Sequence, residues 1–315
     1  MQNVGMKCTR CRQPAEHRFA SHNVHFCDRC LGVFIRRQVE RAIKQFDMLQ
    51  PGQPVLVALS GGKDSLVLWR VLRELGYQAE AIHIGLGLGE FSQASLAACR
   101  AMAEMEGGRL HYFELAQLTG FGVEEIARAN RRQFCSVCGT VKRHFVNRLC
   151  LELGFDTLAM GQHLDDEAAR LLGNMIHRRQ DFMDKQWPVL EGVAGKFARK
   201  VKPLVRLAGQ EIGAYGRALG LPVCQVTCSK SRGATLTYYQ EAMDLLEQRM
   251  PGTKRALYFG FLEGKDGPAP GLEISGECVR CGAPTFVELC GCCRLLQKAE
   301  ARRGPRSDDL VGGHS

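Results

Sequence analysis

The hexapeptide Ser60-Gly61-Gly62-Lys63-Asp64-Ser65 stands between an apolar run and an amphipathic run of the sequence. The apolar run, residues 55–59, reads V-L-V-A-L and is typical of a buried strand. After the hexapeptide, apolar residues recur at helical spacing over 66–75, and Gly76 is suited to cap a helix C-terminus. The hexapeptide is therefore predicted to be a turn that leads from a strand into a helix.

Such a turn is suited to bind phosphate. Its two glycines let the backbone approach an anion, and the N-terminus of the following helix offers unpaired N–H groups at the positive end of a dipole. Ser60, Lys63 and Ser65 add side-chain donors. The spacing differs from that of the kinase-type phosphate loop. It resembles the S-G-G-x-D-S loop of the ATP-pyrophosphatase enzymes, which implies transfer of AMP to an oxygen with release of pyrophosphate.

Predicted strands and helices alternate from residue 55 onward. Further strands are expected at 79–84, 110–115 and 157–160, with helices at 92–105 and 123–129 and another that begins within 161–168. This alternation predicts an α/β fold with a doubly wound, mainly parallel sheet of the ATP-pyrophosphatase, HUP-like type. Ligands of such sheets bind at the carboxyl ends of the strands. The predicted nucleotide-binding residues are Ser60, Gly61, Gly62, Lys63, Asp64, Ser65, His83, Gly161 and Asp166.

Composition excludes two broad classes of protein. With 315 residues, 45% of them hydrophobic and 24% charged, the chain has the composition of a globular protein rather than a disordered one. No run is long and apolar enough to span a bilayer, and the N-terminus lacks an apolar secretion signal, so a cytoplasmic location without membrane contact is expected. A net charge of +9 favours an acidic partner, of which nucleic acid is one kind.

Fifteen cysteines in a chain without a secretion signal indicate metal ligands or redox chemistry. Two groups have the spacing of structural four-thiolate zinc sites, in which each Cys-x-x-Cys turn presents two sulfurs to one ion. They flank the predicted α/β fold as N- and C-terminal zinc knuckles. The first group is Cys8, Cys11, Cys27 and Cys30; the second is Cys278, Cys281, Cys290 and Cys293, with Cys292 left as a spare.

A third Cys-x-x-Cys, formed by Cys135 and Cys138, has no such partner pair. It enters a helix expected to continue to about residue 153, and the further thiols available are Cys224 and Cys228. Three thiolates suit a four-iron four-sulfur cluster with one iron open to another ligand, whereas a structural zinc takes four. A redox Cys-x-x-Cys and a third zinc held with both later cysteines remain open alternatives. Cys99 and Cys150 are interpreted as inert core thiols.

Several motifs, taken in order, resemble those of the TtuA-type tRNA 2-thiouridine synthetases, within the TtcA/TtuA family of tRNA thiolation enzymes. The resemblance covers nearly the whole chain up to residue 301. Besides the two knuckles and S-G-G-K-D-S, the matching segments are C-S-V-C-G-x-x-K-R from Cys135, G-x-x-L-D-D-E-A from Gly161, C-x-x-x-x-G-A from Cys228 and M-P-G-x-K from Met250.

The resemblance implies an activity and assigns roles to matching residues. It implies that ATP activates the C2 oxygen of a tRNA uridine, and that sulfur replaces this oxygen through a four-iron four-sulfur cluster. A ubiquitin-like thiocarboxylate protein, or another sulfide donor, would supply the sulfur. By motif, the cluster ligands are Cys135, Cys138 and Cys228, and the catalytic residues are Asp64, Lys142 and Asp166. The two aspartates suit the Mg²⁺ that accompanies ATP.

The resulting domain organisation has four parts: a zinc finger at 1–31, the ATP-pyrophosphatase domain with the iron–sulfur site at 32–264, a second zinc finger at 272–300 and a disordered tail at 301–315. A homodimer is a candidate assembly. Between the two later cysteines, Cys228 is expected to be the cluster ligand because it precedes a polar loop with a glycine, whereas Cys224 ends an apolar run, 221–223, that resembles a strand.

Two other functions account for part of the same pattern. One is a cluster-free tRNA thiolase that carries sulfur as a persulfide or disulfide on the same cysteines. The other is a non-catalytic, zinc-dependent RNA-binding module in which the nucleotide only regulates binding. The motifs do not separate a T-loop uridine from a wobble uridine as the thiolated nucleotide.

Overall fold

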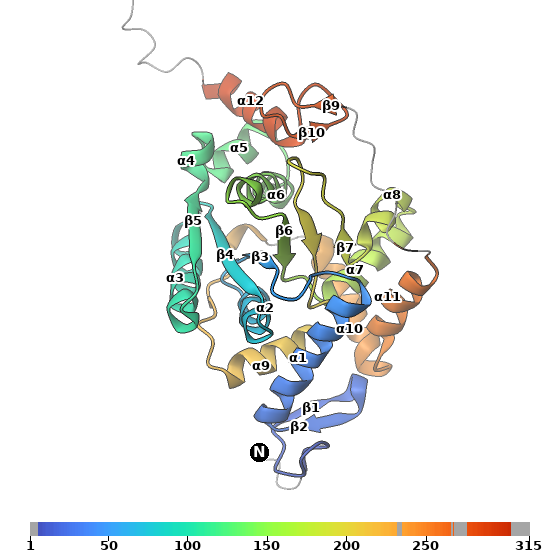
Figure 1. The fold of residues 1–315 in the computed structure, drawn as a ribbon. Helices are drawn as coiled ribbons and strands as arrows, with labels where there is room; N and C mark the ends of the chain where they lie inside the picture. The colour runs from blue at the N-terminus through green and yellow to red at the C-terminus, as the bar shows by residue number, and fades with distance from the viewer. Residues whose placement is uncertain (1–5, 232–234, 266, 268–275, 304–315) are drawn as a thin grey trace, which may run out of the picture.

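The computed structural model describes residues 6–231, 235–265, 267 and 276–303. Its centre is a six-stranded sheet with helices on both faces (Figure 1). The strands follow the order β5-β4-β3-β6-β8-β7 and are β3 (Pro54–Ala58), β4 (Gln78–Gly85), β5 (Leu110–Glu114), β6 (Thr157–Met160), β7 (Val189–Leu190) and β8 (Arg199–Val201). Neighbouring strands are parallel except β7, which is antiparallel to β8. The predicted α/β class with a mainly parallel sheet is confirmed.

Strand β3 is apolar on both sides because both faces of the sheet are covered. Val55 and Val57 belong to one hydrophobic cluster, and Leu56 between them belongs to another. Successive side chains of a strand point to opposite faces, so the two clusters lie on opposite sides of the sheet. The apolar run before the phosphate loop is therefore a central strand buried on both faces.

Each cluster joins the sheet to its own set of helices. The first cluster contains residues of α1 (Asp28–Gln45), α2 (Lys63–Glu74), α3 (Gly89–Glu106), α7 (Leu164–Ile176), α9 (Gly209–Ala218), α10 (Thr235–Arg249) and α11 (Thr253–Glu263). The second contains residues of α4 (Leu115–Thr119), α5 (Val123–Asn130), α6 (Phe134–Glu152) and α12 (Gly291–Arg303). Trp69 of α2 is fully buried, and its indole N–H donates to the Ala79 carbonyl at 2.9 Å, which ties this helix to β4.

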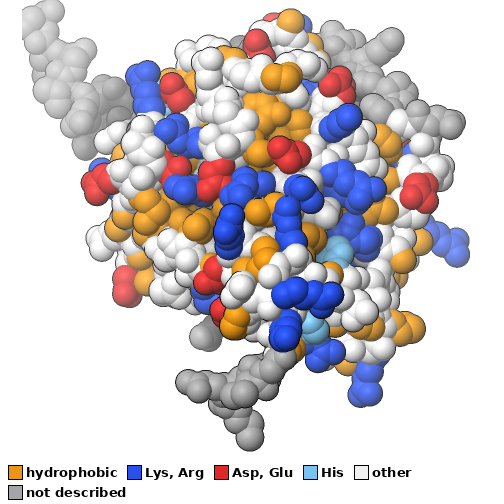
Figure 2. Space-filling model, turned by 60° about the horizontal axis from the view of Figure 1, so that its bottom comes forward, with side chains coloured by type: hydrophobic (Ala, Val, Ile, Leu, Met, Phe, Trp, Pro, Cys, Tyr) orange, Lys and Arg blue, Asp and Glu red, His pale blue; other side chains and the backbone are white. Residues whose placement is uncertain are grey.

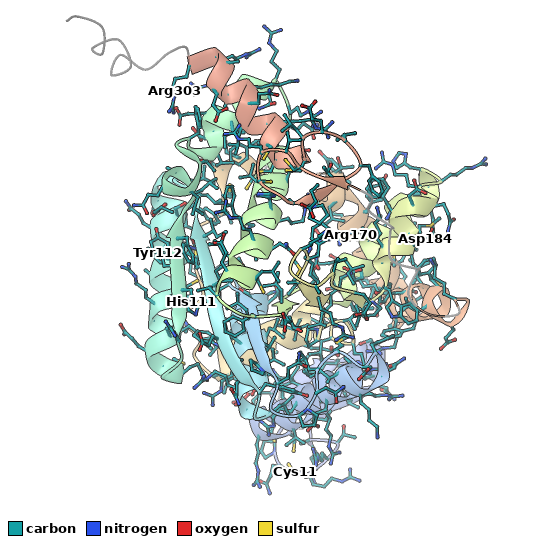
Figure 3. The ribbon with its side chains drawn as sticks, turned by 45° about the horizontal axis from the view of Figure 1, so that its top comes forward. Cys11, His111, Tyr112, Arg170, Asp184 and Arg303 are labelled. Carbon is teal, nitrogen blue, oxygen red and sulfur yellow. The ribbon has the colours of Figure 1, made fainter. Side chains whose placement is uncertain are left out.

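The two cysteine knuckles lie at opposite ends of the molecule (Figure 1). The N-terminal knuckle carries a hairpin of β1 (His17–Phe19) and β2 (Val24–Phe26), and the C-terminal knuckle carries β9 (Gly276–Glu277) and β10 (Pro284–Thr285). Figure 3 shows the same separation, with Cys11 at one end and Arg303 at the other. The sheet and its helices thus lie between the knuckles, as the cysteine spacing predicted.

Two features differ from expectation. Residues 221–223 form no strand, because Pro222 lacks an N–H and the chain there crosses the phosphate loop instead of joining the sheet. Helix α12 continues to Arg303, so the tail predicted from 301 is wrong for its first residues. The Arg303 guanidinium lies 3.7 Å from the Phe121 ring centre and donates to Gly120, which holds the helix end. Residues 304–315 lie outside the described residues, as do most of residues 265–271 between the predicted second and third domains.

Sequence periodicity missed β7, β8, α9, α11 and α12, since these elements are short or only weakly amphipathic. The domain boundaries stay a prediction. Within the described parts of the chain, no helix is both long and apolar enough to cross a membrane.

Candidate functional site

The phosphate loop is closed by hydrogen bonds among its own residues. Ser65 Oγ donates to the Gly62 carbonyl at 3.0 Å and accepts from the Ser60 N–H at 3.1 Å. Gly61 has a φ of +76°, and a Cβ there would lie 2.7 Å from the Ser95 carbonyl oxygen of α3. Glycine is therefore required at this position both by conformation and by space. Helix α2 begins directly after Gly62, so its N-terminal N–H groups face the loop.

A cavity of about 280 Å³ opens at the carboxyl ends of β3, β4 and β6. Six predicted site residues line this one space, whereas Asp166 is not among its lining residues; the six are Ser60, Asp64, Ser65, His83, Lys142 and Gly161. The cavity is the ligand position expected of a parallel sheet. Its size and its phosphate loop fit a nucleotide.

His83 presents a hydrogen-bond acceptor toward this cavity. Its Nδ1 lies 3.1 Å from the Leu59 carbonyl, which only accepts, so Nδ1 carries the hydrogen. Its Nε2 is buried without a hydrogen-bond partner among the described residues. Burial, reinforced by the charge of Lys142, lowers the pKa of His83. The ring is thus kept neutral, with one free acceptor beside the nucleotide cavity.

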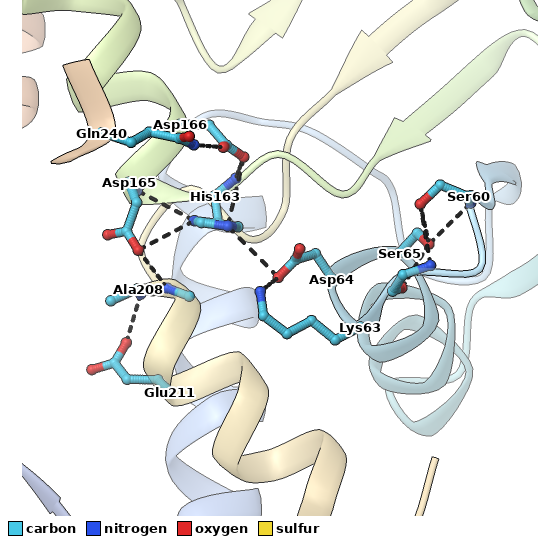
Figure 4. Close-up of polar contacts among 12 residues, drawn as sticks. Ser60, Lys63, Asp64, Ser65, His163, Asp165, Asp166, Ala208, Glu211 and Gln240 are labelled. Atoms are coloured by element: carbon cyan, nitrogen blue, oxygen red, sulfur yellow. Dashed lines mark hydrogen bonds and ion pairs between the residues drawn. The ribbon is translucent and has the colours of Figure 1, made fainter. Parts of the chain in front are cut away.

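Three side chains from two elements meet beside the phosphate loop (Figure 4). His163 Nε2 lies 3.6 Å from Asp64 Oδ1 of α2 and 3.7 Å from Asp166 Oδ2 of α7. The Asp165 N–H donates to His163 Nδ1 at 3.3 Å, so the hydrogen of the neutral ring lies on Nε2, facing both carboxylates. Gln240 of α10 donates to the other oxygen of Asp166 at 2.9 Å. Asp64 and Asp166 are thus oriented as a pair of oxygen ligands next to the site of the phosphates.

The neighbouring Asp165 has a different role. Its Oδ2 accepts from the Gly209 N–H at 2.9 Å, at the start of α9, and its Oδ1 lies 3.0 Å from the Nζ of Lys254. Lys254 is buried and also pairs with Asp244. Asp165 therefore connects α7, α9 and α11, while Asp166 lies beside His163 and Gln240.

One face of α6 connects the cavity to the third Cys-x-x-Cys. Cys135, Cys138 and Lys142 follow one another at spacings of three and four residues, so they share this face. Lys142 lines the nucleotide cavity. Burial raises the pKa of the Cys138 thiol, and the positive charge of Lys142 opposes that rise. The positive charge of Lys142 therefore lies at the nucleotide cavity and also lowers the pKa of Cys138.

The structure separates the two later cysteines. The segment Ser229–Ser231 packs on α6, and Cys135 Sγ lies 3.5 Å from the Lys230 carbonyl. The negative charge of a Cys228 thiolate raises the pKa of Cys138, after the larger effect of burial. Cys224 lies elsewhere: its N–H donates to the Gly61 carbonyl at 2.9 Å, and its charge acts on Cys99. Cys228 thus lies near Cys135 and Cys138, whereas the backbone of Cys224 contacts the phosphate loop.

The two knuckles have sulfur geometry that fits zinc. In each group, the four sulfurs lie within 4.8 Å of one another. Cys11 and Cys27 sulfurs are 3.7 Å apart, as are those of Cys281 and Cys290. A tetrahedral ion with Zn–S bonds of about 2.3 Å needs sulfurs about 3.8 Å apart. Burial alone would raise the pKa of Cys8, but backbone N–H donors lower it to about 6, which favours a thiolate.

The predicted site residues thus gather around the carboxyl edge of the sheet, and three further residues join them that the sequence did not single out. His163 was overlooked inside the G-x-x-L-D-D-E-A segment, although a polar residue directly before the first residue of a helix is a signal for an N-cap. Lys254 is the lysine of the M-P-G-x-K segment. Its ion pair with Asp165 depends on the position of α11, which the sequence alone did not predict. Gln240 carries no local signal.

The family model of the PP-loop domain matches residues 35–222. The loop, the parallel sheet and this match make the chain a PP-loop protein, the class in which the S-G-G-x-D-S loop binds ATP.

Curated relatives match along almost the whole chain. The tRNA-5-methyluridine(54) 2-sulfurtransferase of Thermus thermophilus is 42% identical over 305 residues, covering 96% of this chain and 94% of the relative. The protein of the same name from Thermotoga maritima is 36% identical, covering 95% and 98%. The U34-tRNA thiolase NcsA of Methanococcus maripaludis, solved with its [4Fe-4S] cluster, superposes with a TM-score of 0.79 at 26% identity, covering 93% of this chain and 96% of that one. The chain belongs to the TtuA-type family of tRNA 2-thiolation sulfurtransferases.

Proposed function

We propose that this protein is an ATP-dependent tRNA uridine 2-sulfurtransferase that acts on uridine 54 of the T-loop. The observation that carries the proposal is the position of Lys142, on one face of α6 between the nucleotide cavity and the Cys135–Cys138 pair. The choice of position 54 is supported by relatives of that name at 36% and 42% identity, whereas the U34-specific structure is 26% identical.

The first half-reaction uses the phosphate-loop side of the site. The uridine O2 attacks the α-phosphorus of ATP; a P–O bond forms, the bond to the β-phosphate oxygen breaks, and pyrophosphate leaves. The loop N–H groups, Lys63 and Lys142 stabilise the charge that develops on the phosphates. Asp64 and Asp166 present the hard oxygen ligands that Mg²⁺ prefers, and His163 holds them apart. The free acceptor of His83 suits an amino group of the adenine.

The second half-reaction replaces the activated oxygen by sulfur. A sulfide nucleophile attacks C2, a C–S bond forms, the C–O bond breaks and AMP leaves with the oxygen. A four-iron four-sulfur cluster on Cys135, Cys138 and Cys228 would supply an iron site for that sulfide, because three protein thiolates leave one iron open. In the described chain these three sulfurs do not form a group within 4.8 Å, which disfavours one shared zinc ion and suits a wider cluster. Cys138 would be one ligand of that cluster, and Lys142, four residues later on the same face of α6, lines the nucleotide cavity.

The remaining assignments follow from the same chemistry. The two knuckles each hold a zinc ion, the sulfide donor is a ubiquitin-like thiocarboxylate protein or free sulfide, and the enzyme works in the cytoplasm, with a homodimer as the candidate assembly.

Figure 2 shows Lys and Arg side chains gathered on the face that carries the N-terminal end of the molecule. On this side, Arg206 is buried near Arg41 and Arg255, and burial with these two charges lowers its pKa to about 10. Such positive charge favours an RNA substrate.

The test uses anaerobically reconstituted protein, ATP, sulfide and two tRNA transcripts. One transcript keeps uridines 34 and 54, and the other has cytidine at 54. We expect pyrophosphate release and a 2-thiouridine at position 54 by mass spectrometry only with the first transcript. Thiolation of the second transcript at 34 would refute the position; tRNA binding without pyrophosphate release would favour the RNA-binding module.

Iron content separates the two sulfur chemistries. About four irons per chain are expected in the active protein, with loss of thiolation when the iron is removed. Full activity of iron-free protein would instead support persulfide transfer on the same cysteines.

A further inference from the structure

A groove of about 460 Å³ lies on the neighbouring face of α6, outside the nucleotide cavity. One wall is α6, with Arg143, His144 and Asn147; the second is the β7–β8 hairpin, with Lys196 and Lys200. The third wall is the backbone of the C-terminal knuckle around residues 281–284 and 290–292. In Figure 1 these three elements lie together at the end of the molecule that bears α12.

Two cations of this groove pair with no carboxylate among the described residues. Lys196 pairs with Glu277 at 2.7 Å, and Arg148 pairs with Glu152 at 2.6 Å. Arg143 and Lys200, by contrast, have no carboxylate within ion-pair distance in the described part of the chain. The Lys200 ammonium lies 5.5 Å from the centre of the Phe197 ring, which is a weaker interaction than an ion pair. The groove therefore carries two unneutralised positive charges.

Arg143 is exposed and Lys200 is half-buried, and their like charges repel each other. Burial lowers the pKa of Lys200, and the charge of Arg143 lowers it further. Burial lowers the pKa of Arg143 as well, followed by the charge of Arg170. A desolvated cation is costly unless an anion accompanies it. An anion in the groove would relieve the repulsion between the half-buried Lys200 and the exposed Arg143.

The same cations lead toward the reaction site. Arg143 directly follows Lys142, and it acts on the neighbouring Arg170, which Figure 3 shows near the middle of the molecule. Arg170 bonds Glu167 at 3.3 Å, one residue after Asp166. Arg143 and Arg170 thus extend the positive charge of the groove toward Asp166. A polyanion that reached from the groove to the reaction site would meet positive charge along this path.

The thiolates of the C-terminal knuckle do not account for this charge. Among the cations, Arg280 acts on the thiol of Cys292, and Arg280 is itself paired with Glu300. Neither Arg143 nor Lys200 is among the main charges that act on the three ligand cysteines Cys278, Cys281 and Cys293. Within the described chain the anionic groups that act on the two cations are the thiols of Cys138 and Cys150, and no carboxylate pairs with either cation.

We propose that this groove binds a phosphodiester of the tRNA backbone, with Arg143 and Lys200 as its two cationic contacts. The proposal rests on the proposed function, because tRNA is the polyanion that the site must receive. It adds a docking point at the C-terminal knuckle that positions the T-loop uridine over the nucleotide cavity.

The test measures tRNA affinity of the full-length holoprotein by fluorescence anisotropy at several salt concentrations. The variants are Arg143→Gln and Lys200→Gln, and Arg109→Gln is the control because it removes an exposed cation on the opposite part of the sheet. Each groove variant should weaken binding about tenfold and lower the slope of log affinity against log salt by roughly 0.9, whereas the control should leave both nearly unchanged. Zinc content and circular dichroism check that the knuckle is intact.

A second readout separates docking from structural support. Without tRNA, Lys200→Gln should unfold at the same or a higher temperature than the wild type, because it relieves crowding of like charges; a lower temperature would indicate a structural lysine and overturn the proposal. Groove variants that bind tRNA like Arg109→Gln would overturn it too. If tRNA binding were unchanged but thiolation with a protein-bound sulfur donor were lost, the partner would be an acidic protein instead. Absence of pyrophosphate release by the wild type would refute the proposed function itself, independently of the groove.

Discussion

The imidazole of His163 lies between two carboxylates, with its Nε2 3.6 Å from Asp64 and 3.7 Å from Asp166. Asp64 belongs to the helix that follows the phosphate loop, whereas Asp166 belongs to the helix after β6. The contact therefore joins two parallel crossover units at the edge where the nucleotide cavity opens. The two adjacent aspartates therefore have different partners: Asp166 lies beside His163 Nε2, whereas Asp165 pairs with Lys254.

We expect substitutions at the two adjacent aspartates to have different consequences. Asp166→Asn removes a charge that lies beside His163 and should lower pyrophosphate release by about 10²- to 10³-fold with little change in stability. Asp165→Asn leaves buried Lys254 without one of its carboxylates and should cost roughly 3 kcal/mol of unfolding free energy. Urea unfolding and pyrophosphate assays on both variants test this division. Equal stabilities, or a larger catalytic loss for Asp165→Asn, would contradict it.

The two later cysteines offer a matched pair for the cluster. Cys228→Ala should lose the cluster absorbance and thiolation together while ATP binding is retained, because Cys228 is on the side of Cys135 and Cys138. Cys224→Ala should keep the cluster, because its backbone contacts the phosphate loop instead. Iron analysis and anaerobic absorption spectra measure this. Loss of iron in both variants would indicate a four-thiolate site.

The phosphate loop tolerates substitution at only one of its two glycines. Gly61→Ala forces a side chain into a positive φ and against the Ser95 backbone, and it should cost about 1–2 kcal/mol from conformation alone, with loss of ATP binding. Gly62→Ala meets only Ser60 Oγ at 3.4 Å and should retain the fold. Thermal unfolding and ATP titration compare the two. Equal behaviour would show that the loop rearranges in solution.

Stability should depend on pH through His83. Burial lowers its folded pKa below the ordinary 6.5, so the folded state stays neutral while the unfolded chain takes up a proton. Above pH 6.5 this group contributes nothing to the pH dependence. As pH falls from 6.5 toward the folded pKa, it should destabilise the protein by up to about 1.4 kcal/mol per pH unit. Urea unfolding at pH 7.5 and 5.5 should show a smaller difference for His83→Asn, and an undiminished difference would assign the effect to other groups.

The C-terminal knuckle contains two adjacent cysteines with different expected roles. Cys293 lies in the four-sulfur group, whereas Cys292 is buried outside it. Cys293→Ser should therefore reduce the zinc content from two ions per chain to one, and Cys292→Ser should retain both. Elemental analysis of the purified variants measures this directly. Retention of two zinc ions by Cys293→Ser would place Cys292 among the ligands.

The sequence by itself determined those features whose chemistry lies within a single turn or a single run. Phosphate-loop donors, each Cys-x-x-Cys and the spacing of Cys138 to Lys142 are local, so residue order alone places the groups close together. The apolar run 55–59 likewise identified β3, since a short run that is apolar at successive positions and followed by a glycine turn is typical of a strand buried on both faces. From these local features followed the parallel sheet and the edge at which ligands bind.

Only the tertiary structure decided the contacts between residues far apart in the chain. The positions of His163 beside Asp64, Lys254 beside Asp165 and Cys228 beside α6 depend on how the helices pack after each crossover, and no periodicity encodes that packing. The same holds for the groove of Arg143 and Lys200, whose charges become unusual only when two elements bring them together away from carboxylates. Local spacing thus specified the chemical groups, and long-range packing specified which of them face one another.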